Sequence, residues 1–146
     1  MSSNLTLSSN KHEGDMNRLS KKLQSAWSLK KPLYLDKKDK RYPRHLKQLK
    51  SNGFSDSETW GLYEVIIDFI LPRLIRFKEV NNGYPAGMTQ EEWDNIIDKM
   101  IFSFQWIKDE SKRLGTALSA DERAAGERKY EEGIDLFAKY FRGLWW

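Results

Sequence analysis

The sequence predicts an all-α protein, a helical bundle of three main helices with a basic N-terminal arm that carries one or two short helices. Three capping boxes, each a Ser or Thr followed three residues later by Glu, mark helix starts because they satisfy free N–H groups of a first turn. After each start, apolar residues recur at alternating steps of three and four, which is typical of a helix that packs on others. The boxes are Ser55 with Glu58, Thr89 with Glu92, and Ser119 with Glu122.

Three parts are expected along the 146 residues. Residues 1–17 are rich in Ser and Asn and poor in bulky apolar residues, so we expect a disordered tail. Residues 18–53 form the basic arm with its short helices. Residues 54–146 form the bundle core, which is expected to be a single domain.

Two short helices are predicted in the arm. Leu19, Leu23 and Trp27 recur at four-residue spacing, which indicates a first helix of modest length. Pro43 suits the start of a second helix, and Gly53 would end it.

The first main helix is expected to begin at the Ser55 capping box and to be apolar on more than one side. Its predicted seam consists of Trp60, Tyr63, Ile67, Ile70, Leu74 and Phe77. Further apolar residues fall outside the seam: Ile66, Phe69, Leu71 and Ile75. A helix that is apolar all round is usually central, so we expect the N-terminal segment to cover its back.

A loop at 81–87 precedes the second main helix, whose predicted seam consists of Trp93, Ile97, Met100, Phe104 and Ile107. The third helix is expected to begin weakly, because Gly126 and Gly133 lower helix propensity. Its predicted seam consists of Tyr130, Ile134, Phe137, Phe141 and Leu144. We expect Trp145 and Trp146 to dock on the bundle, because exposed tryptophans are unfavourable in water.

The composition excludes several classes of protein. The chain has no cysteine, so it has no disulfide framework, cysteine–metal site or thiol nucleophile. Its N-terminus lacks the charged region and apolar core of a signal peptide, and no apolar run is long enough to span a membrane. We therefore expect a soluble cytoplasmic protein with no membrane partner.

The net charge of +4 conceals an uneven distribution. Residues 11–50 hold thirteen Lys/Arg and four Asp/Glu, whereas residues 51–146 hold twelve basic and seventeen acidic side chains. A basic segment on an acidic body is typical of an arm that binds nucleic acid or an acidic partner. The alternative is that the arm packs across its own acidic domain.

Two groups of residues are candidates for binding another macromolecule. Phe102 and Trp106 lie four apart, opposite the seam of the second helix, and are either covered by the N-terminal arm or exposed as a patch. Tyr84, in a Gly-Tyr-Pro loop, joins them as a candidate contact for a protein partner. The cluster in the arm suits phosphate contacts with aromatic stacking. Its candidate residues are Lys37, Lys38, Lys40, Arg41, Arg44 and Lys47.

Side chains for catalysis are scarce. The two histidines are His12 and His45, so neither a nucleophilic triad nor a zinc site is predicted. His45 is expected on the solvated surface, with a phosphate contact as the alternative. The glycines are too scattered for a phosphate-binding loop.

Acidic residues at helical spacing leave one enzymatic alternative, an Mg²⁺-dependent all-α nucleotide pyrophosphatase. They are Glu91, Glu92, Asp94, Asp98, Glu132 and Asp135. Helix capping and solvated helix faces account for these carboxylates more simply. No catalytic residue, metal or cofactor is therefore predicted.

Several segments between Tyr42 and the C-terminus resemble a family of small uncharacterised proteins encoded by tailed bacteriophages. They are Tyr42–Leu46, Gly53–Asp56 with Trp60, Gly83–Pro85, Met88–Trp93 and Leu136–Trp145. The resemblance implies a phage origin and expression in the cytoplasm of a bacterial host, and it implies no activity. Tyr63 stands where members of the family tend to have Asp.

The sequence therefore predicts a non-enzymatic phage accessory protein that acts by binding another macromolecule, a host or defence factor. The alternative is sequence-tolerant nucleic-acid binding through the basic arm. The alternative predicts a strongly salt-dependent affinity, because phosphate contacts release counterions.

Overall fold

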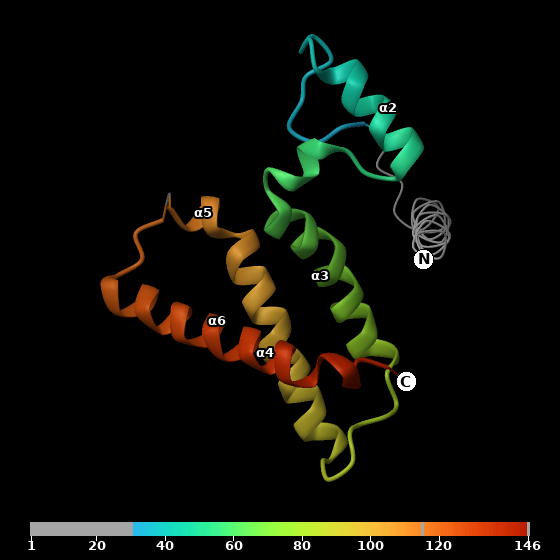
Figure 1. Ribbon diagram of the computed structural model, residues 1–146. Coiled ribbons are helices and arrows are strands. Elements are labelled where there is room, and N and C mark those ends of the chain that lie inside the picture. The colour runs from blue at the N-terminus through green and yellow to red at the C-terminus, as the bar shows by residue number, and fades with distance from the viewer. Residues whose placement is uncertain (1–30, 115, 146) are drawn as a thin grey trace, which may run out of the picture. The chain divides into compact units, whose positions relative to one another are not determined.

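The computed structural model describes residues 31–114 and 116–145. In this part of the chain every regular element is a helix, which confirms the predicted all-α class (Figure 1). The chain divides after Leu62 into two compact units, the N-terminal unit (residues up to 62) and the C-terminal unit (residues 63–146). The sequence predicts a boundary at 53/54, whereas this division places residues 54–62 with the arm.

The described part of the N-terminal unit contains helix α2 (Tyr42–Asn52) and the 3₁₀ turn η1 (Asp56–Thr59). α2 is the predicted second short helix, with Pro43 in its first turn. Gly53 ends the helix with a φ of 84° and donates its N–H to the Leu49 carbonyl. Glycine adopts this left-handed conformation without the steric cost that other residues meet.

The first capping box forms, but it does not begin a main helix. The Ser55 N–H donates to the Glu58 carboxylate at 2.7 Å, and the element that follows is η1. Helix α3 (Leu62–Val80) begins only after Trp60 and Gly61. Glycine is about 1 kcal/mol less favourable than alanine inside a helix, which favours an interruption at this point.

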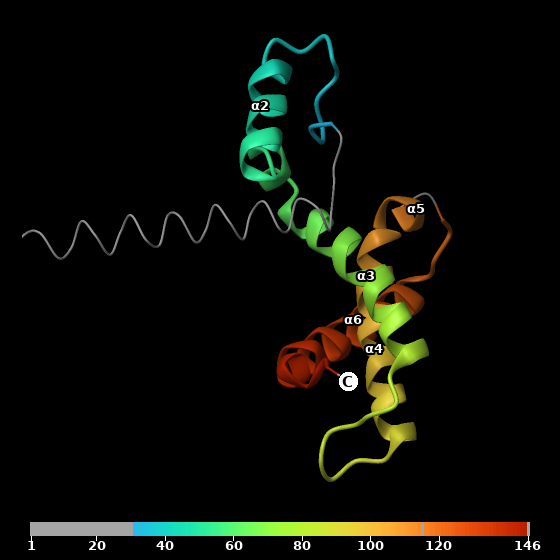
Figure 2. The same cartoon turned by 90° about the vertical axis from the view of Figure 1, so that its right-hand side faces the viewer.

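The C-terminal unit is built on a hairpin of α3 and α4 (Gln90–Lys108), which run side by side in opposite directions (Figures 1 and 2). Their facing side chains form one apolar core cluster. Its buried members are Ile67, Leu71, Leu74, Trp93, Ile97, Met100 and Phe104. Every predicted seam residue of α4 belongs to this cluster or packs against it.

The core-facing side of α3 differs from the predicted seam. Leu71 was expected outside the seam and is 3% exposed in the core, whereas Tyr63 was expected inside it and is 54% exposed. Trp60 is also half exposed and precedes the helix. Apolar residues at steps of three and four define a stripe more than 100° wide on the helix surface. The spacing alone therefore does not decide which of the residues at the edges of this stripe are buried.

The second predicted helix start is confirmed. Thr89 precedes α4 and accepts the Glu92 N–H, while the Glu92 carboxylate accepts the Thr89 N–H. Met88, one residue before this cap, packs against the core cluster that contains Trp93. These are the positions of a hydrophobic staple, which fixes the direction in which the chain enters the helix.

Helix α6 (Ala120–Tyr140) begins at the third predicted box and crosses α4 at close range (Figures 1 and 2). Gly126 and Gly133 are buried at this crossing. A Cβ on Gly126 would lie 1.9 Å from Cη2 of Trp106, and one on Gly133 would lie 2.1 Å from the Lys99 carbonyl oxygen. The two glycines therefore allow α6 to approach α4, and the helix is continuous through them.

A short helix, α5 (Glu110–Leu114), follows α4, and the 3₁₀ turn η2 (Phe141–Gly143) follows α6. After η2, Leu144 packs against the core cluster. The expectation that the C-terminal tryptophans dock on the bundle is wrong for Trp145, whose side chain is 75% exposed. Trp145 lies on a short tail beyond the last turn, where none of the described helices covers it. Trp146 lies outside the described residues.

Several predictions for the N-terminal third lie outside the described residues. They concern the tail at 1–17, the helix with Leu19, Leu23 and Trp27, and the cover expected over the back of α3. Of the apolar residues of α3 that were expected outside the seam, Ile66 and Ile75 are 49% and 41% exposed. None of the helices that the structure describes combines the length and apolar character that crossing a bilayer requires.

Candidate functional site

The six candidate residues for nucleic-acid binding are all exposed in the N-terminal unit. Four lysines form no ion pair with any residue that the structure describes: Lys37, Lys38, Lys40 and Lys47. No described residue of the N-terminal unit therefore prevents their ammonium groups from contacting an anionic ligand.

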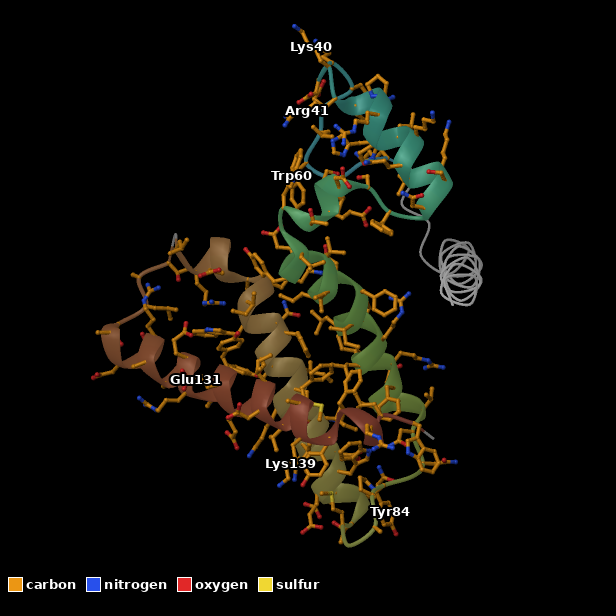
Figure 3. The ribbon with its side chains drawn as sticks, in the orientation of Figure 1. Lys40, Arg41, Trp60, Tyr84, Glu131 and Lys139 are labelled. Atoms are coloured by element: carbon orange, nitrogen blue, oxygen red, sulfur yellow. The ribbon has the colours of Figure 1, made fainter. Side chains whose placement is uncertain are left out.

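The two candidate arginines differ from the lysines, because each has an acidic neighbour. Arg41 donates to Asp39 from Nε at 3.0 Å and from Nη2 at 2.8 Å, and these hydrogen bonds lower the pKa of Asp39 to about 2. The Arg41 guanidinium also lies 5.2 Å from the centre of the Trp60 ring (Figure 3). Arg44 is 3.5 Å from the Asp56 carboxylate.

His45 is buried, so the expectation of a solvated surface histidine is wrong. Its side chain is 4% exposed, and its Nδ1 accepts the Ser57 N–H at 3.3 Å. Its ring meets the Trp60 ring edge to face at 5.5 Å. α2 and η1 pack together across this histidine, which therefore has a structural role and offers no phosphate contact.

Phe102 and Trp106 stack on each other and pack against α6. Their ring centres are 5.8 Å apart, and the Trp106 Nε1–H donates to Glu127 at 3.0 Å. The Arg113 guanidinium covers the Trp106 ring at 3.7 Å. Both aromatic side chains are half-buried. Packing between helices of the C-terminal unit therefore covers much of the surface that was predicted to contact a protein partner.

Tyr84 is 54% exposed and lies beside the C-terminal tail (Figure 3). A hollow of about 330 Å³ is lined by residues 82–85 together with Gly143 and Trp145. The loop is held in place by Asn81, whose side chain donates to the Gly83 carbonyl and accepts its N–H. The structure thus brings Tyr84 together with an exposed tryptophan 61 residues later in the sequence.

The acidic residues of the pyrophosphatase alternative do not gather. Glu92 caps α4, Asp98 pairs with Lys78 at 2.6 Å, and Glu132 pairs with Lys99. Asp94 accepts a hydrogen bond from Gln90. Within residues 31–114 and 116–145, no three His, Cys, Asp or Glu side chains are placed to hold a metal ion.

One further surface lies between α3, α4 and α6, and we call it the acid-rimmed groove. It consists of two adjoining hollows of about 260 and 370 Å³ that share Tyr63, Ile67, Ile107 and Glu110. The apolar hollow is completed by Ile66, Phe104, Tyr130 and Ile134. The other hollow is completed by Glu64, Asp68, Lys108 and Leu114.

Acidic side chains predominate among the described residues that line the groove. They are Glu64, Asp68 and Glu110, and the Lys108 ammonium group pairs with Asp68 at 3.0 Å. The Tyr63 hydroxyl donates to Glu64 at 3.1 Å, and this hydrogen bond raises the pKa of Tyr63. The charges of Glu64 and Glu110 act in the same direction, because both disfavour the phenolate.

Sequence reasoning missed this groove. The available signal was Ile66, an apolar residue outside the predicted seam and flanked along α3 by Glu64 and Asp68. Comparisons of the chain with protein-family models, with curated proteins and with solved structures found no match. The candidate surfaces therefore have to be judged by their own geometry and charge.

Proposed function

We propose that this chain is a non-enzymatic accessory protein of a tailed phage that acts by binding another macromolecule, a protein of the host or of its defences. The observation that supports this best is the acid-rimmed groove, where Tyr63 and Ile66 remain about half exposed beside other apolar side chains. Contiguous exposed apolar surface is typical of an interaction site. The phage origin is supported by the resemblance of segments between Tyr42 and the C-terminus.

The engagement of the acidic residues also favours binding over catalysis. Glu92, Asp98 and Glu132 each have a capping or ion-pairing role within the helices. A nucleotide pyrophosphatase needs such carboxylates free to hold Mg²⁺.

Site-specific photo-crosslinking in a bacterial host tests this proposal. A photoreactive amino acid is placed at Ile66, at Tyr84, and at Ile75 as a matched control on an exposed position of α3 outside the groove. A discrete adduct with one host protein is expected from Ile66 or Tyr84 and not from Ile75. Magnesium-dependent nucleotide hydrolysis that is lost on Asp98→Ala or Asp135→Ala would overturn the proposal.

Nucleic-acid binding through the N-terminal unit is the second candidate function. It is supported by four exposed lysines that pair with no acidic residue in the described part of the chain, and by the exposed ring of Trp60 next to Arg41. Lysines that neutralise phosphates and an aromatic ring on which a base can stack are the usual components of sequence-tolerant single-strand binding.

An oligo-dT of about 20 nucleotides, long enough for one or two sites of the usual size, serves as the probe. Changing Lys37, Lys38, Lys40 and Lys47 to Gln should abolish binding or weaken its dependence on salt. In the second case, the slope of the logarithm of the association constant against the logarithm of the salt concentration should become shallower by about 0.7 for each phosphate that the lysines no longer neutralise. The matched control changes four exposed basic residues of the C-terminal unit to Gln: Arg123, Arg128, Lys139 and Arg142. Equal slopes for the two quadruple variants would rule out binding through the lysines.

A further inference from the structure

Trp60 is an exposed aromatic residue in the most positively charged part of the chain. Residues up to 62, which form the N-terminal unit, hold thirteen Lys/Arg and six Asp/Glu, whereas residues 63–146 hold twelve and fifteen. The first count includes residues 1–30, so a surplus of seven positive charges belongs to the whole unit. A macromolecule that binds this unit through charge is therefore expected to be a polyanion.

The loop before α2 turns its acidic side chains onto its own backbone. Asp36 accepts the Lys38 N–H at 2.8 Å, and Asp39 accepts the Arg41 N–H at 2.8 Å. The lysines between and beside these carboxylates are exposed. The acidic side chains thus stabilise the turns of the loop, and the side chains that the loop offers to a ligand are basic.

Asp39 also holds the Arg41 side chain in one orientation. The guanidinium donates to both carboxylate oxygens, from Nε at 3.0 Å and from Nη2 at 2.8 Å. This pairing uses two of the five N–H donors of the guanidinium, and the others donate to no residue that the structure describes. Arg41 is thus oriented by Asp39 and keeps donors for a phosphate, which a planar guanidinium binds well.

The oriented guanidinium lies over the Trp60 ring, 5.2 Å from its centre. Lys40, Arg41 and Trp60 follow one another along one side of the unit (Figure 3). The buried ring of His45 supports Trp60 edge to face at 5.5 Å, and half of the Trp60 side chain remains exposed. A supported and half-exposed indole next to cationic side chains is a surface on which a nucleic-acid base can stack.

We propose that Trp60, Arg41 and Asp39 form a nucleotide subsite that selects single strands. An unpaired base stacks on the Trp60 ring, the adjacent phosphate binds the Arg41 guanidinium, and Asp39 is the positioning residue for that guanidinium. This inference rests on the second candidate function, nucleic-acid binding through the N-terminal unit. It adds the residues that distinguish a single strand from other polyanions.

Other polyanions would pair with the lysines and leave the Trp60 ring uncovered. A duplex keeps its bases stacked on one another, and an acidic protein segment presents carboxylates without bases. The affinity of either ligand would therefore be independent of the ring. The dependence on Trp60 is what separates the proposed ligand from these two.

The first test compares a labelled oligo-dT of about 20 nucleotides with a duplex of equal length at one salt concentration. Trp60→Leu removes the ring and keeps an apolar side chain over His45. It should weaken oligo-dT binding by about tenfold, within the usual range for one stacked base, and change duplex binding by less than about twofold. Trp60→Phe, which restores a ring, should recover most of the loss. Trp145→Leu, at an exposed tryptophan of the C-terminal unit, is the matched control and should change neither affinity.

A stacked base also has a spectroscopic signature that a purely structural role of Trp60 would not produce. Saturating oligo-dT should quench part of the tryptophan emission of the unmodified chain. This quenching should be absent in Trp60→Phe and persist in Trp145→Phe. Circular dichroism confirms that the variants fold.

The positioning role of Asp39 is tested by the sign of an effect. Asp39→Asn and Asp36→Asn each remove one negative charge and keep a side-chain oxygen that can accept the backbone N–H. Charge alone predicts that both variants bind any polyanion more tightly. Asp36→Asn should do so, because Asp36 pairs with no basic side chain that the structure describes. Asp39→Asn should instead bind oligo-dT more weakly, by up to about fivefold, the upper range for an exposed ion pair.

The outcomes separate this inference from the function on which it rests. Equal loss of duplex and oligo-dT binding in Trp60→Leu, quenching that persists in Trp60→Phe, or unchanged or tighter binding by Asp39→Asn would overturn the subsite. Displacement of oligo-dT by polyglutamate as readily as by unlabelled oligo-dT would do the same. If the quadruple lysine variant nevertheless loses its affinity, nucleic-acid binding through the N-terminal unit stands without the subsite. An unmodified chain that binds neither oligo-dT nor duplex would overturn both.

Discussion

Gly133 is a residue whose effect on the fold is opposite to what helix propensity alone suggests. A Cβ at this position would lie 2.0 Å from the Ser103 Oγ and 2.1 Å from the Lys99 carbonyl oxygen. Ser103 is fully buried and donates its hydroxyl to the Tyr130 carbonyl at 2.7 Å, so the surrounding groups are held in place. A backbone oxygen cannot move aside as a flexible side chain can.

Gly133→Ala is therefore expected to lower the free energy of unfolding by about 1–3 kcal/mol, the cost of overpacking a well-packed site. Helix propensity alone predicts the opposite sign, a gain of about 0.5–1 kcal/mol. Urea denaturation followed by circular dichroism distinguishes the two. Gly143→Ala is the matched control, because a Cβ there meets its neighbours at 3.6 Å, an ordinary contact distance.

Glu58 and Glu122 occupy the same position in two capping boxes, but their pKa values shift in opposite directions. Burial raises the pKa of Glu58 above its ordinary value of 4.5, and the hydrogen bond from Ser55 only partly opposes this. Hydrogen bonds from the Ser119 N–H and hydroxyl lower the pKa of Glu122. Glu58 therefore contributes stability below pH 4.5 that is lost as pH rises through its folded pKa. The contribution of Glu122 is present above pH 4.5 and is lost as pH falls through its folded pKa.

Glu58→Gln and Glu122→Gln should therefore show opposite pH dependences, since Gln keeps the capping geometry and cannot ionise. From about pH 3 to pH 7, the stability of Glu58→Gln relative to the unmodified chain should rise, and that of Glu122→Gln should fall. Urea midpoints measured across this range check both. Parallel pH dependences for the two variants would contradict the assigned shifts.

At the scale of the element, α3 contains an interior proline on its exposed side. Pro72 has no N–H to donate to the Asp68 carbonyl, and its ring crowds that carbonyl. Pro72→Ala should raise the free energy of unfolding by about 1–2 kcal/mol, because the restored hydrogen bond outweighs the entropy that the unfolded chain regains. Denaturation midpoints measure this gain, with Glu79→Ala as an exposed control on the same helix. An unchanged or lower midpoint would show that surrounding packing requires the proline.

Helix boundaries were predictable where they depend on neighbours within four residues. The Thr89 and Ser119 boxes begin α4 and α6, and Gly53 ends α2. The Ser55 box also forms, but it begins a single 3₁₀ turn because the chain reaches Gly61 before a helix can extend. A capping box thus predicts where a turn begins and does not predict how long the element will be.

At the scale of the whole molecule, the apolar core cluster formed by the described residues lies within the C-terminal unit. Its first buried member is Ile67 and its last is Phe104, with α6 packed on α4 across the two glycines. A fragment of residues 61–146 should therefore keep its helical circular dichroism and unfold in one cooperative thermal transition. A broad, non-cooperative transition would show that this unit depends on residues before 61.

The features that the sequence did not predict depend on contacts between elements that are distant in the sequence. The burial of His45 follows from the packing of α2 on η1, and no residue next to it in the sequence indicates this. Gly126 and Gly133 are weak points of a helix by propensity alone, and only the presence of α4 beside them explains why glycine is needed there. The acid-rimmed groove joins residues of α3, α4 and α6 that lie up to 71 positions apart, so no local motif could indicate it.

The different burial of the tryptophans has a spectroscopic consequence. Trp93 is completely buried, whereas Trp145 is 75% exposed beside Tyr84. Acrylamide should therefore quench the emission of Trp145 strongly and that of Trp93 weakly. A ligand that covers the hollow next to Tyr84 would protect Trp145 from the quencher and shift its emission to shorter wavelength, so that binding at this end of the molecule can be followed without a label.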